Sequence, residues 1–197
     1  MCTRVLWPDA DDAVLVGRNM DYHRDTGSNL WVFPRGIARN DGVDGTLTWT
    51  SKYGSLTASG LDLFSVDGMN EVGLAGHDLW LAESDYGTYD KSLPALAISF
   101  WLQYFLDNFA TVADTVAWVR ETNVQVVPLT DPSTGEVAVL HIALEDASGD
   151  SAIIEYVNGE PVIHHSRDYR VMTNSPTYDQ QLELLRQWEG LGGLVHG

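Results

Sequence analysis

Cys2 is the only cysteine of the chain, and it directly follows Met1. A cysteine is small enough for the methionine before it to be trimmed, which would leave one residue that carries both a thiol and a free α-amine. The amine titrates near pH 8 and the thiol at about 8.5, so the amine can accept the thiol proton and generate a thiolate nucleophile. The alternative is that Cys2 is an ordinary apolar residue at the start of a strand.

Three further side chains could complete such a site. Arg18 and Asp21 follow an apolar strand. An aspartate close to the new terminus could hold the α-ammonium, and a nearby arginine would favour the thiolate; a surface ion pair is the alternative. Asn174 stands between a strand end and Pro176, where its amide could donate to the oxyanion of a tetrahedral intermediate. An Asx turn is the alternative interpretation of this residue.

The elements that must position these residues begin with a hairpin. We expect strands over 2–7 and 13–17, joined by an acidic turn over 8–12, so that Cys2 stands at the open end with its amine free. The remaining patterns predict nine more strands and a strong turn over 67–71. The strands are expected over 30–33, 47–50, 55–61, 63–66, 72–75 (leading into 76–81), 137–144, 151–157, 161–165 and 169–172. Helices are expected over 93–107 with Ser92 as N-cap, over 112–121 with Thr111 as N-cap, and over 178–188.

Composition limits the class of protein. With 197 residues, 44% of them hydrophobic, the chain can form one domain over 1–197 with its own core. The net charge of −17 excludes a basic face for nucleic acid and argues against docking on an anionic membrane. A single cysteine excludes an internal disulfide and Cys-based metal sites, and the histidines lack ligand spacing, so we expect no metal or cofactor. Without a membrane-length apolar run or a signal peptide, the expected location is cytoplasmic, or periplasmic or secreted if a signal peptide has been removed.

Eight motifs in order along the chain carry a resemblance to one family. They are MCTR (1–4), GRNMDY (17–22), NLWVFPRG (29–36), WTSKYGS (49–55), GMNEVGL (68–74), LWLAES (79–84), GDSAIIEY (149–156) and VMTNSPTYDQQL (171–182). Together they resemble the choloylglycine hydrolase family, the cysteine branch of the N-terminal-nucleophile hydrolases, which includes penicillin V acylases and conjugated bile salt hydrolases. LWLAES and HHS (164–166) are more similar to the penicillin V acylase and acyl-homoserine-lactone acylase branch.

The resemblance implies an α+β fold, a four-layer αββα sandwich of two antiparallel sheets between helices. Members of the family are longer than this chain. The resemblance therefore implies that the chain corresponds to the amino-terminal part of such an enzyme, truncated on the carboxyl side, and that it lacks a further active-site arginine and several strands. It implies a homo-oligomer as well.

The resemblance also assigns roles to residues of this chain. Cys2 is implied to be the nucleophile with its own amine as base, beside Arg18, Asp21 and the oxyanion donor Asn174. The backbone near Asp78 and Leu79 is implied to supply a second oxyanion donor. The family often has asparagine at the position of Asp78, whose charge would oppose an oxyanion if the side chain took part. Tyr22 and Trp80 are implied to bind substrate; from the sequence alone these aromatics, with Trp31, are either pocket walls or core.

The function expected from these observations is hydrolysis of a linear, non-peptide amide with an apolar acyl group. Attack by the thiolate forms an acyl-enzyme, and water releases it with the amine as base. Met1 must be absent, because an acylated nitrogen has no lone pair to accept a proton. The alternative is a non-catalytic fragment that binds an amphipathic ligand or partner.

Overall fold

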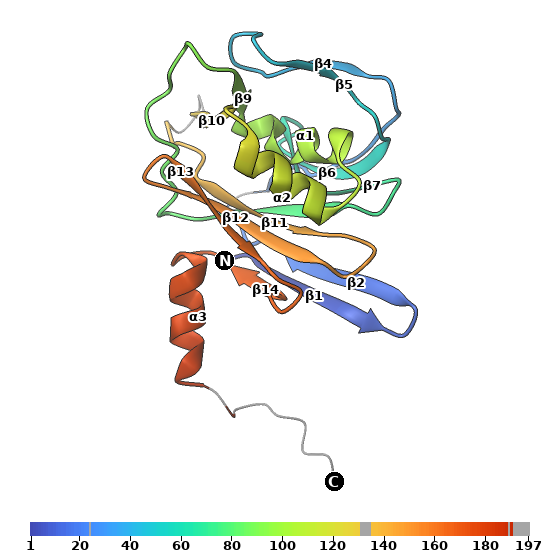
Figure 1. Ribbon diagram of the computed structural model, residues 1–197, viewed down its shortest axis with the longest axis vertical. Helices are drawn as coiled ribbons and strands as arrows, with labels where there is room; N and C mark the ends of the chain where they lie inside the picture. Colours follow the sequence, from blue (N-terminus) through green and yellow to red (C-terminus); the bar gives the residue numbers. More distant parts are fainter. Residues whose placement is uncertain (24, 131–134, 189, 191–197) are drawn as a thin grey trace.

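An antiparallel sheet of seven strands forms the centre of the computed structural model, which describes residues 1–23, 25–130, 135–188 and 190 (Figure 1). The strands lie in the order β13-β12-β11-β8-β7-β6-β3. They are β3 (Leu30–Phe33), β6 (Ser55–Gly60), β7 (Phe64–Asn70), β8 (Ala75–Trp80), β11 (Leu140–Glu145), β12 (Ser151–Val157) and β13 (Glu160–His165). β11 and β12 are buried along almost their whole length, and apolar residues such as Ile142–Leu144 and Ala152–Ile154 form their centres.

A smaller sheet brings the two ends of the candidate site together. It consists of β14 (Val171–Thr173), β1 (Thr3–Ala10) and β2 (Ala13–Asn19), in that order. Thr3 pairs with Thr173, so Cys2 and Asn174 flank one cross-strand pair although 172 residues separate them. Cys2, Arg4 and Leu6 are buried against the large sheet, whereas the alternate residues Val5 and Trp7 are exposed.

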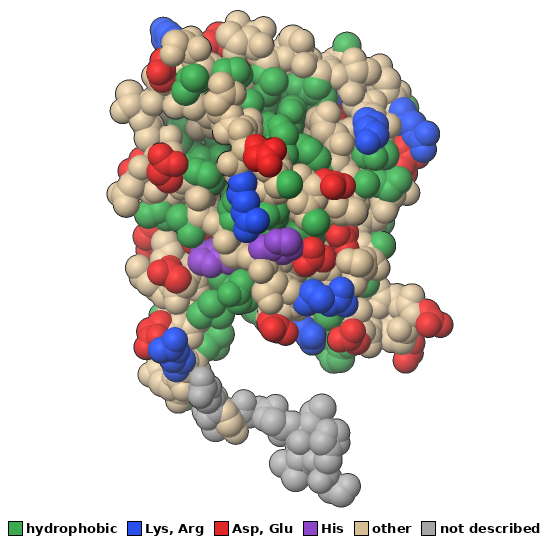
Figure 2. Space-filling view, viewed as in Figure 1, with side chains coloured by type: hydrophobic (Ala, Val, Ile, Leu, Met, Phe, Trp, Pro, Cys, Tyr) green, Lys and Arg blue, Asp and Glu red, His purple; other side chains and the backbone are tan. Residues whose placement is uncertain are grey.

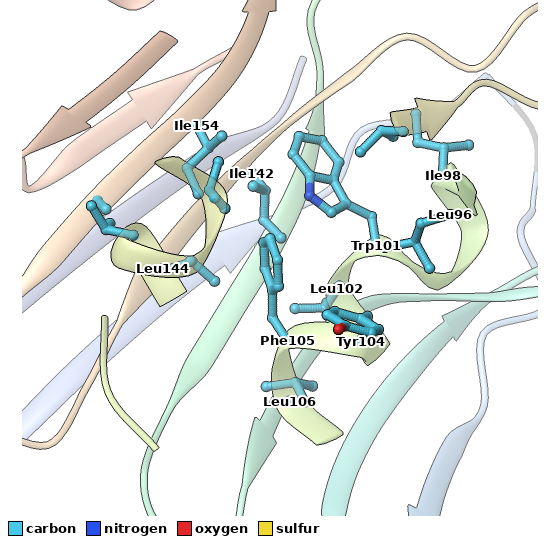
Figure 3. Close-up of a cluster of buried hydrophobic side chains, with 14 of the residues drawn as sticks. Leu96, Ile98, Trp101, Leu102, Tyr104, Phe105, Leu106, Ile142, Leu144 and Ile154 are labelled. Atoms are coloured by element: carbon cyan, nitrogen blue, oxygen red, sulfur yellow. The ribbon is translucent and has the colours of Figure 1, made fainter. Parts of the chain in front are cut away.

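Helices cover the other face of the large sheet. α1 (Trp101–Asn108), which continues the short helix η1 (Ile98–Phe100), and α2 (Val112–Glu121) pack on this face (Figure 1). Side chains of α1 point toward Ile142, Leu144 and Ile154 of β11 and β12 (Figure 3). Glycine allows the helix to approach closely, because a Cβ on Gly76 would lie 2.7 Å from Leu102 Cδ1.

The remaining elements lie at the periphery. β4 (Ala38–Asn40) pairs with β5 (Thr48–Thr50), and β9 (Ala95–Ala97) pairs in parallel with β10 (Gln125–Val127). α3 (Tyr178–Arg186) lies beside β14. The buried carboxylate of Glu155 accepts the Tyr178 backbone N–H at the start of α3, at 3.0 and 3.1 Å, where the helix dipole favours an anion.

The predicted α+β fold with antiparallel sheets is confirmed: helices, large sheet and small sheet follow one another, with α3 next to the small sheet. Four local predictions are wrong. The acidic turn expected over 8–12 is confined to residues 11 and 12, because β1 continues to Ala10. The strand expected over 72–75 is β8, which begins only at Ala75. The helix expected over 93–107 begins only after β9 and η1, and Ser92 does not cap it. Of the turn expected over 67–71, residues Asp67–Asn70 belong to β7, because Asp67 pairs with His77 in the sheet.

On the side of the molecule where α1 and α2 lie, acidic side chains are spread over the surface. The basic side chains on this side form only separate groups (Figure 2). Within the described residues, no helix combines the length and the apolar character needed to cross a membrane.

Candidate active site

Cys2 is buried between the two sheets, with 7% of its surface exposed. Its side chain belongs to a small apolar cluster with Leu79, Ala143 and Met172. The Cys2 backbone nitrogen donates to Oδ1 of Asn174 at 2.5 Å. Met1 is still attached, so this nitrogen is an amide here; trimming of Met1 would turn the same atom into the α-amine.

Asn174 is held at both ends of its amide. While Oδ1 accepts from Cys2, Nδ2 donates to the backbone oxygen of Trp80 at 2.7 Å. Its own backbone oxygen accepts from Gln181 of α3 at 2.7 Å. An amide nitrogen carries two hydrogens, so one of them can still donate to an oxyanion. Asn174 therefore has a fixed orientation and one N–H available for chemistry.

Asp21 lies at Met1 and does not contact the Cys2 nitrogen. Its Oδ2 is 3.4 Å from the terminal ammonium of Met1. Asn19 Nδ2 donates to the Met1 oxygen and to Asp21 Oδ2, both at 3.3 Å. Met1 is 86% exposed, so it is accessible to an aminopeptidase.

Arg18 is directed into the space between the sheets from β2. One guanidinium nitrogen donates to Asp67 Oδ2 at 2.5 Å, and another donates to the backbone oxygen of Asp78 at 2.7 Å. Arg18 is the cross-strand partner of Arg4, which lies on the same face of β1 as Cys2. Arg18 and Cys2 thus project toward the same part of the large sheet.

Residues 78–80 of β8 contact three of the four candidate catalytic side chains in turn, all but Asp21. The backbone oxygen of Asp78 accepts from Arg18, and that of Trp80 accepts from Asn174. Between them, Leu79 packs in the apolar cluster of the cysteine. A single strand therefore sets the relative positions of the predicted nucleophile, the arginine and the oxyanion donor.

The Asp78 side chain is fully buried, and within the described residues neither of its carboxyl oxygens has a hydrogen-bond partner. Burial, together with the charge of Asp67, raises the pKa of Asp78 well above its usual range. The protonated, uncharged form of this carboxyl group is therefore favoured. It lies on the opposite face of β8 from Leu79, so it places no negative charge against an oxyanion.

Tyr22 and Trp80, the predicted substrate-binding aromatics, are 41% and 39% exposed. The Tyr22 ring lies 4.3 Å from the ring of His23. Trp31 belongs elsewhere, to a cavity of about 230 Å³ that Phe33, Arg39 and Phe100 also line. Cys2 does not line that cavity. The structure thus separates Trp31 from the other two predicted pocket aromatics.

His77 is the functional candidate that the sequence interpretation missed. Its ring bridges the carboxylates of Asp67 and Glu145, at 2.7 and 2.6 Å. Asp67 in turn holds Arg18. The register of the β7–β8 hairpin could have identified His77, because it places His77 opposite Asp67. The sequence interpretation assigned Asp67 to a turn over 67–71, so this pairing was not considered. Among the described residues, no group of three or more His, Cys, Asp or Glu side chains could hold a metal ion.

Comparison with known proteins gives concordant results. Residues 2–193 match the model of the family described as linear amide C–N hydrolases, choloylglycine hydrolase family. The chain is 46% identical to penicillin V acylase of Pectobacterium atrosepticum over 98% of its own length, and 28% identical to a bile salt hydrolase/transferase of Clostridium perfringens over 97%.

Solved structures agree with the sequence comparison. Penicillin V acylase from Agrobacterium tumefaciens superposes with a TM-score of 0.88 at 49% identity, covering 98% of this chain. The C2A mutant of conjugated bile acid hydrolase from C. perfringens gives 0.84 at 25% identity over 97% of this chain. The chain spans 54% and 58% of the two curated relatives and 58% of both solved chains. It belongs to the choloylglycine hydrolase family of linear amide C–N hydrolases.

Proposed function

We propose that the protein hydrolyses a linear, non-peptide amide after removal of Met1, with the Cys2 thiolate as nucleophile and the Cys2 α-amine as base. Thiolate attack on the acyl carbon would form a tetrahedral intermediate. The α-ammonium would protonate the leaving amine, and water would then release the acyl group with the amine again acting as base. Asn174 would donate to the oxyanion, and Arg18 would favour the thiolate.

One observation carries the proposal: the backbone nitrogen of Cys2 already sits 2.5 Å from a fixed acceptor, Asn174 Oδ1. After trimming, Asn174 would accept one hydrogen of the amine and so direct its lone pair. The acceptor is anchored through Trp80 on a buried strand. The base would thus be oriented before any substrate binds.

The position of Asp21 supports the trimming step and a role afterwards. Its carboxylate faces the Met1 ammonium, which is lost when Met1 is removed. We propose that Asp21 and Asn19 then border the space that Met1 vacates, beside the new α-amine. An acyl chain or a leaving amine of modest size would occupy this space, and Tyr22 and Trp80 would supply its exposed aromatic walls.

An apolar acyl group is the proposed substrate feature. Penicillin V acylases are among the relatives at 46% and 49% identity, whereas the bile salt hydrolases are at 28% and 25%. Within this class we propose penicillin V-like amides first, with N-acyl-homoserine lactones and conjugated bile acids as further candidates.

The test combines intact mass with a substrate panel. Mass spectrometry of the purified chain shows whether Met1 is removed. Release of amine is then measured with penicillin V, acyl-homoserine lactones and glyco- and tauro-conjugated bile acids, for wild type, Cys2→Ala and Cys2→Ser. We expect turnover that disappears in Cys2→Ala, whereas turnover that survives this substitution refutes the mechanism.

A second candidate, a non-catalytic binding fragment, is favoured by the 7% exposure of Cys2 with Met1 in place. An intact Met1, an unreactive thiol and no turnover would together select it. Light scattering on the same sample tests the proposed homo-oligomer.

A further inference from the structure

Five charged side chains form a row between the two sheets, next to the candidate site. Their order is Arg18, Asp67, His77, Glu145 and Arg4, each in contact with the next. The two arginines are cross-strand partners in the small sheet, and the other three come from β7, β8 and β11 of the large sheet. This charge row therefore joins the sheets through alternating positive and negative groups.

The bonds of His77 define its charge. Nδ1 lies 2.7 Å from Asp67 Oδ1, and Nε2 lies 2.6 Å from Glu145 Oε1. An ionised carboxylate only accepts hydrogen bonds, and a neutral imidazole has a single N–H, so holding both carboxylates requires the imidazolium form. Burial lowers the pKa of His77, but the charge of Glu145 and hydrogen bonds to both carboxylates outweigh it and raise this pKa to about 9.

The groups that face His77 are all accounted for in the described residues. Arg4 of β1 donates through Nε to Glu145 at 3.0 Å, and Arg18 of β2 donates to Asp67 at 2.5 Å. The charge of His77 and hydrogen bonds from it help to lower the pKa of Glu145, against the opposing effect of its burial. On the strand of His77 itself, Asp78 is buried, and its burial raises its pKa well above the usual range.

Loss of the His77 charge would act on Arg18. Asp67 and Glu145 would then face a neutral ring that can donate to only one of them, and the two carboxylates would repel each other. Asp67 is the partner that orients the Arg18 guanidinium. Arg18 in turn projects into the same intersheet space as Cys2.

We infer that His77 is a positioning residue for Arg18: its imidazolium fixes Asp67, and Asp67 holds the guanidinium on the Cys2 side of the intersheet space. This inference rests on the proposed function, in which Arg18 favours the Cys2 thiolate. His77 does not touch the substrate.

The test is the pH profile of Cys2 alkylation by iodoacetamide in the full chain. His77→Gln removes the charge but keeps a hydrogen-bonding side chain, and Asp67→Asn removes the intermediate partner at constant size. We expect each to slow alkylation at pH 7 about fivefold and to move the profile to higher pH, because less of the thiol is ionised.

Asp41→Asn is the matched control. Asp41 is a buried carboxylate that accepts from the backbone of Val43, Gly45 and Leu47, next to β4 and at the opposite end of the molecule from the N-terminus (Figure 1). Its substitution disturbs a buried charge without touching the charge row. We expect its alkylation profile to coincide with that of wild type.

A double-mutant cycle separates positioning from general weakening. In an Arg18→Gln background, His77→Gln should have no further effect on alkylation; an equal effect in both backgrounds overturns the inference. If Arg18→Gln slows alkylation but His77→Gln does not, the inference alone fails. An unchanged profile in Arg18→Gln removes Arg18 from the proposed function, and the inference with it.

The protonation state of His77 can also be measured in the wild-type protein, so this test does not depend on the folding of any variant. In protein labelled with ¹⁵N-histidine, NMR should show a His77 ring that retains both N–H groups at pH 8. A neutral His77 at pH 7 overturns the inference.

Discussion

Protonation of His77 should make the stability of the protein depend on alkaline pH. Its pKa is raised from 6.5 to about 9 in the folded chain, a difference worth roughly 3 kcal/mol of folding free energy. Below pH 6.5 the folded and unfolded chains both carry the proton, and the whole contribution is present. Between pH 6.5 and 9 the unfolded chain loses the proton first, so the contribution falls as pH rises and is lost above pH 9.

The assay is urea unfolding at pH 6, 7.5 and 9.5 for wild type and His77→Gln. We expect the stability difference between the two to be about 3 kcal/mol larger at pH 6 than at pH 9.5. Both proteins carry Cys2→Ala in this assay, because His77→Gln is expected to shift the ionisation of the thiol; the comparison then cancels the other groups that titrate in this range. A difference that is constant across the three pH values would falsify the assignment of an imidazolium at this position.

Three further substitutions test the scaffold. Thr111→Ala should lower the unfolding free energy by about 1 kcal/mol in urea, because Thr111 Oγ1 accepts from the Asp114 N–H at 3.1 Å; Thr111→Ser should stay near wild type, and equal losses would contradict a capping role. Gly76→Ala should cost about 1–3 kcal/mol, since its Cβ would meet Leu102 and Leu144 side-chain atoms at 2.7 and 2.8 Å, and an unchanged Tm would show that the helix can move. Burial raises the pKa of Glu155, but hydrogen bonds from His141 and the Tyr178 N–H, together with the His164 ring at 3.5 Å, lower it to about 2. Acid titration should therefore remove stability from wild type between pH 4.5 and 2 but not from Glu155→Gln, and parallel curves would refute this.

Elements with strong local signals were predictable from the sequence. The helix expected over 112–121 with Thr111 as N-cap is α2. The Asn158–Gly159 hairpin lies between β12 and β13 as expected. In both places the decisive residues are neighbours in the chain, so a short window contains the whole physical reason.

Elements that depend on distant partners were not predictable in the same way. Ala95–Ala97 lies in an apolar run with helical spacing, yet it forms β9 because β10 pairs with it in parallel. Asp67 lies in a turn-like sequence but is drawn into β7, where it contacts His77 and Arg18. Neither partner is visible within a local window.

The candidate site also has a part that was predictable from the sequence and a part that was not. Cys2, Arg18 and Asn174 carry distinctive side chains, and the sequence interpretation named all three. Their supports on β8 are backbone oxygens of Asp78 and Trp80. Every residue has such an oxygen, so no residue type in the sequence could mark these two.

Arg18 and Asn174 are positioned by main-chain oxygens of residues 78 and 80. The side chains at these two positions do not take part in holding them. A substitution at Asp78 or Trp80 therefore leaves these main-chain contacts in place. A shift of β8 by one residue would be far more damaging, because it would turn Leu79 away from the cysteine and offer the arginine and the amide the wrong carbonyls. The register of β8, more than the side chains at these two positions, therefore sets the geometry of the reacting groups.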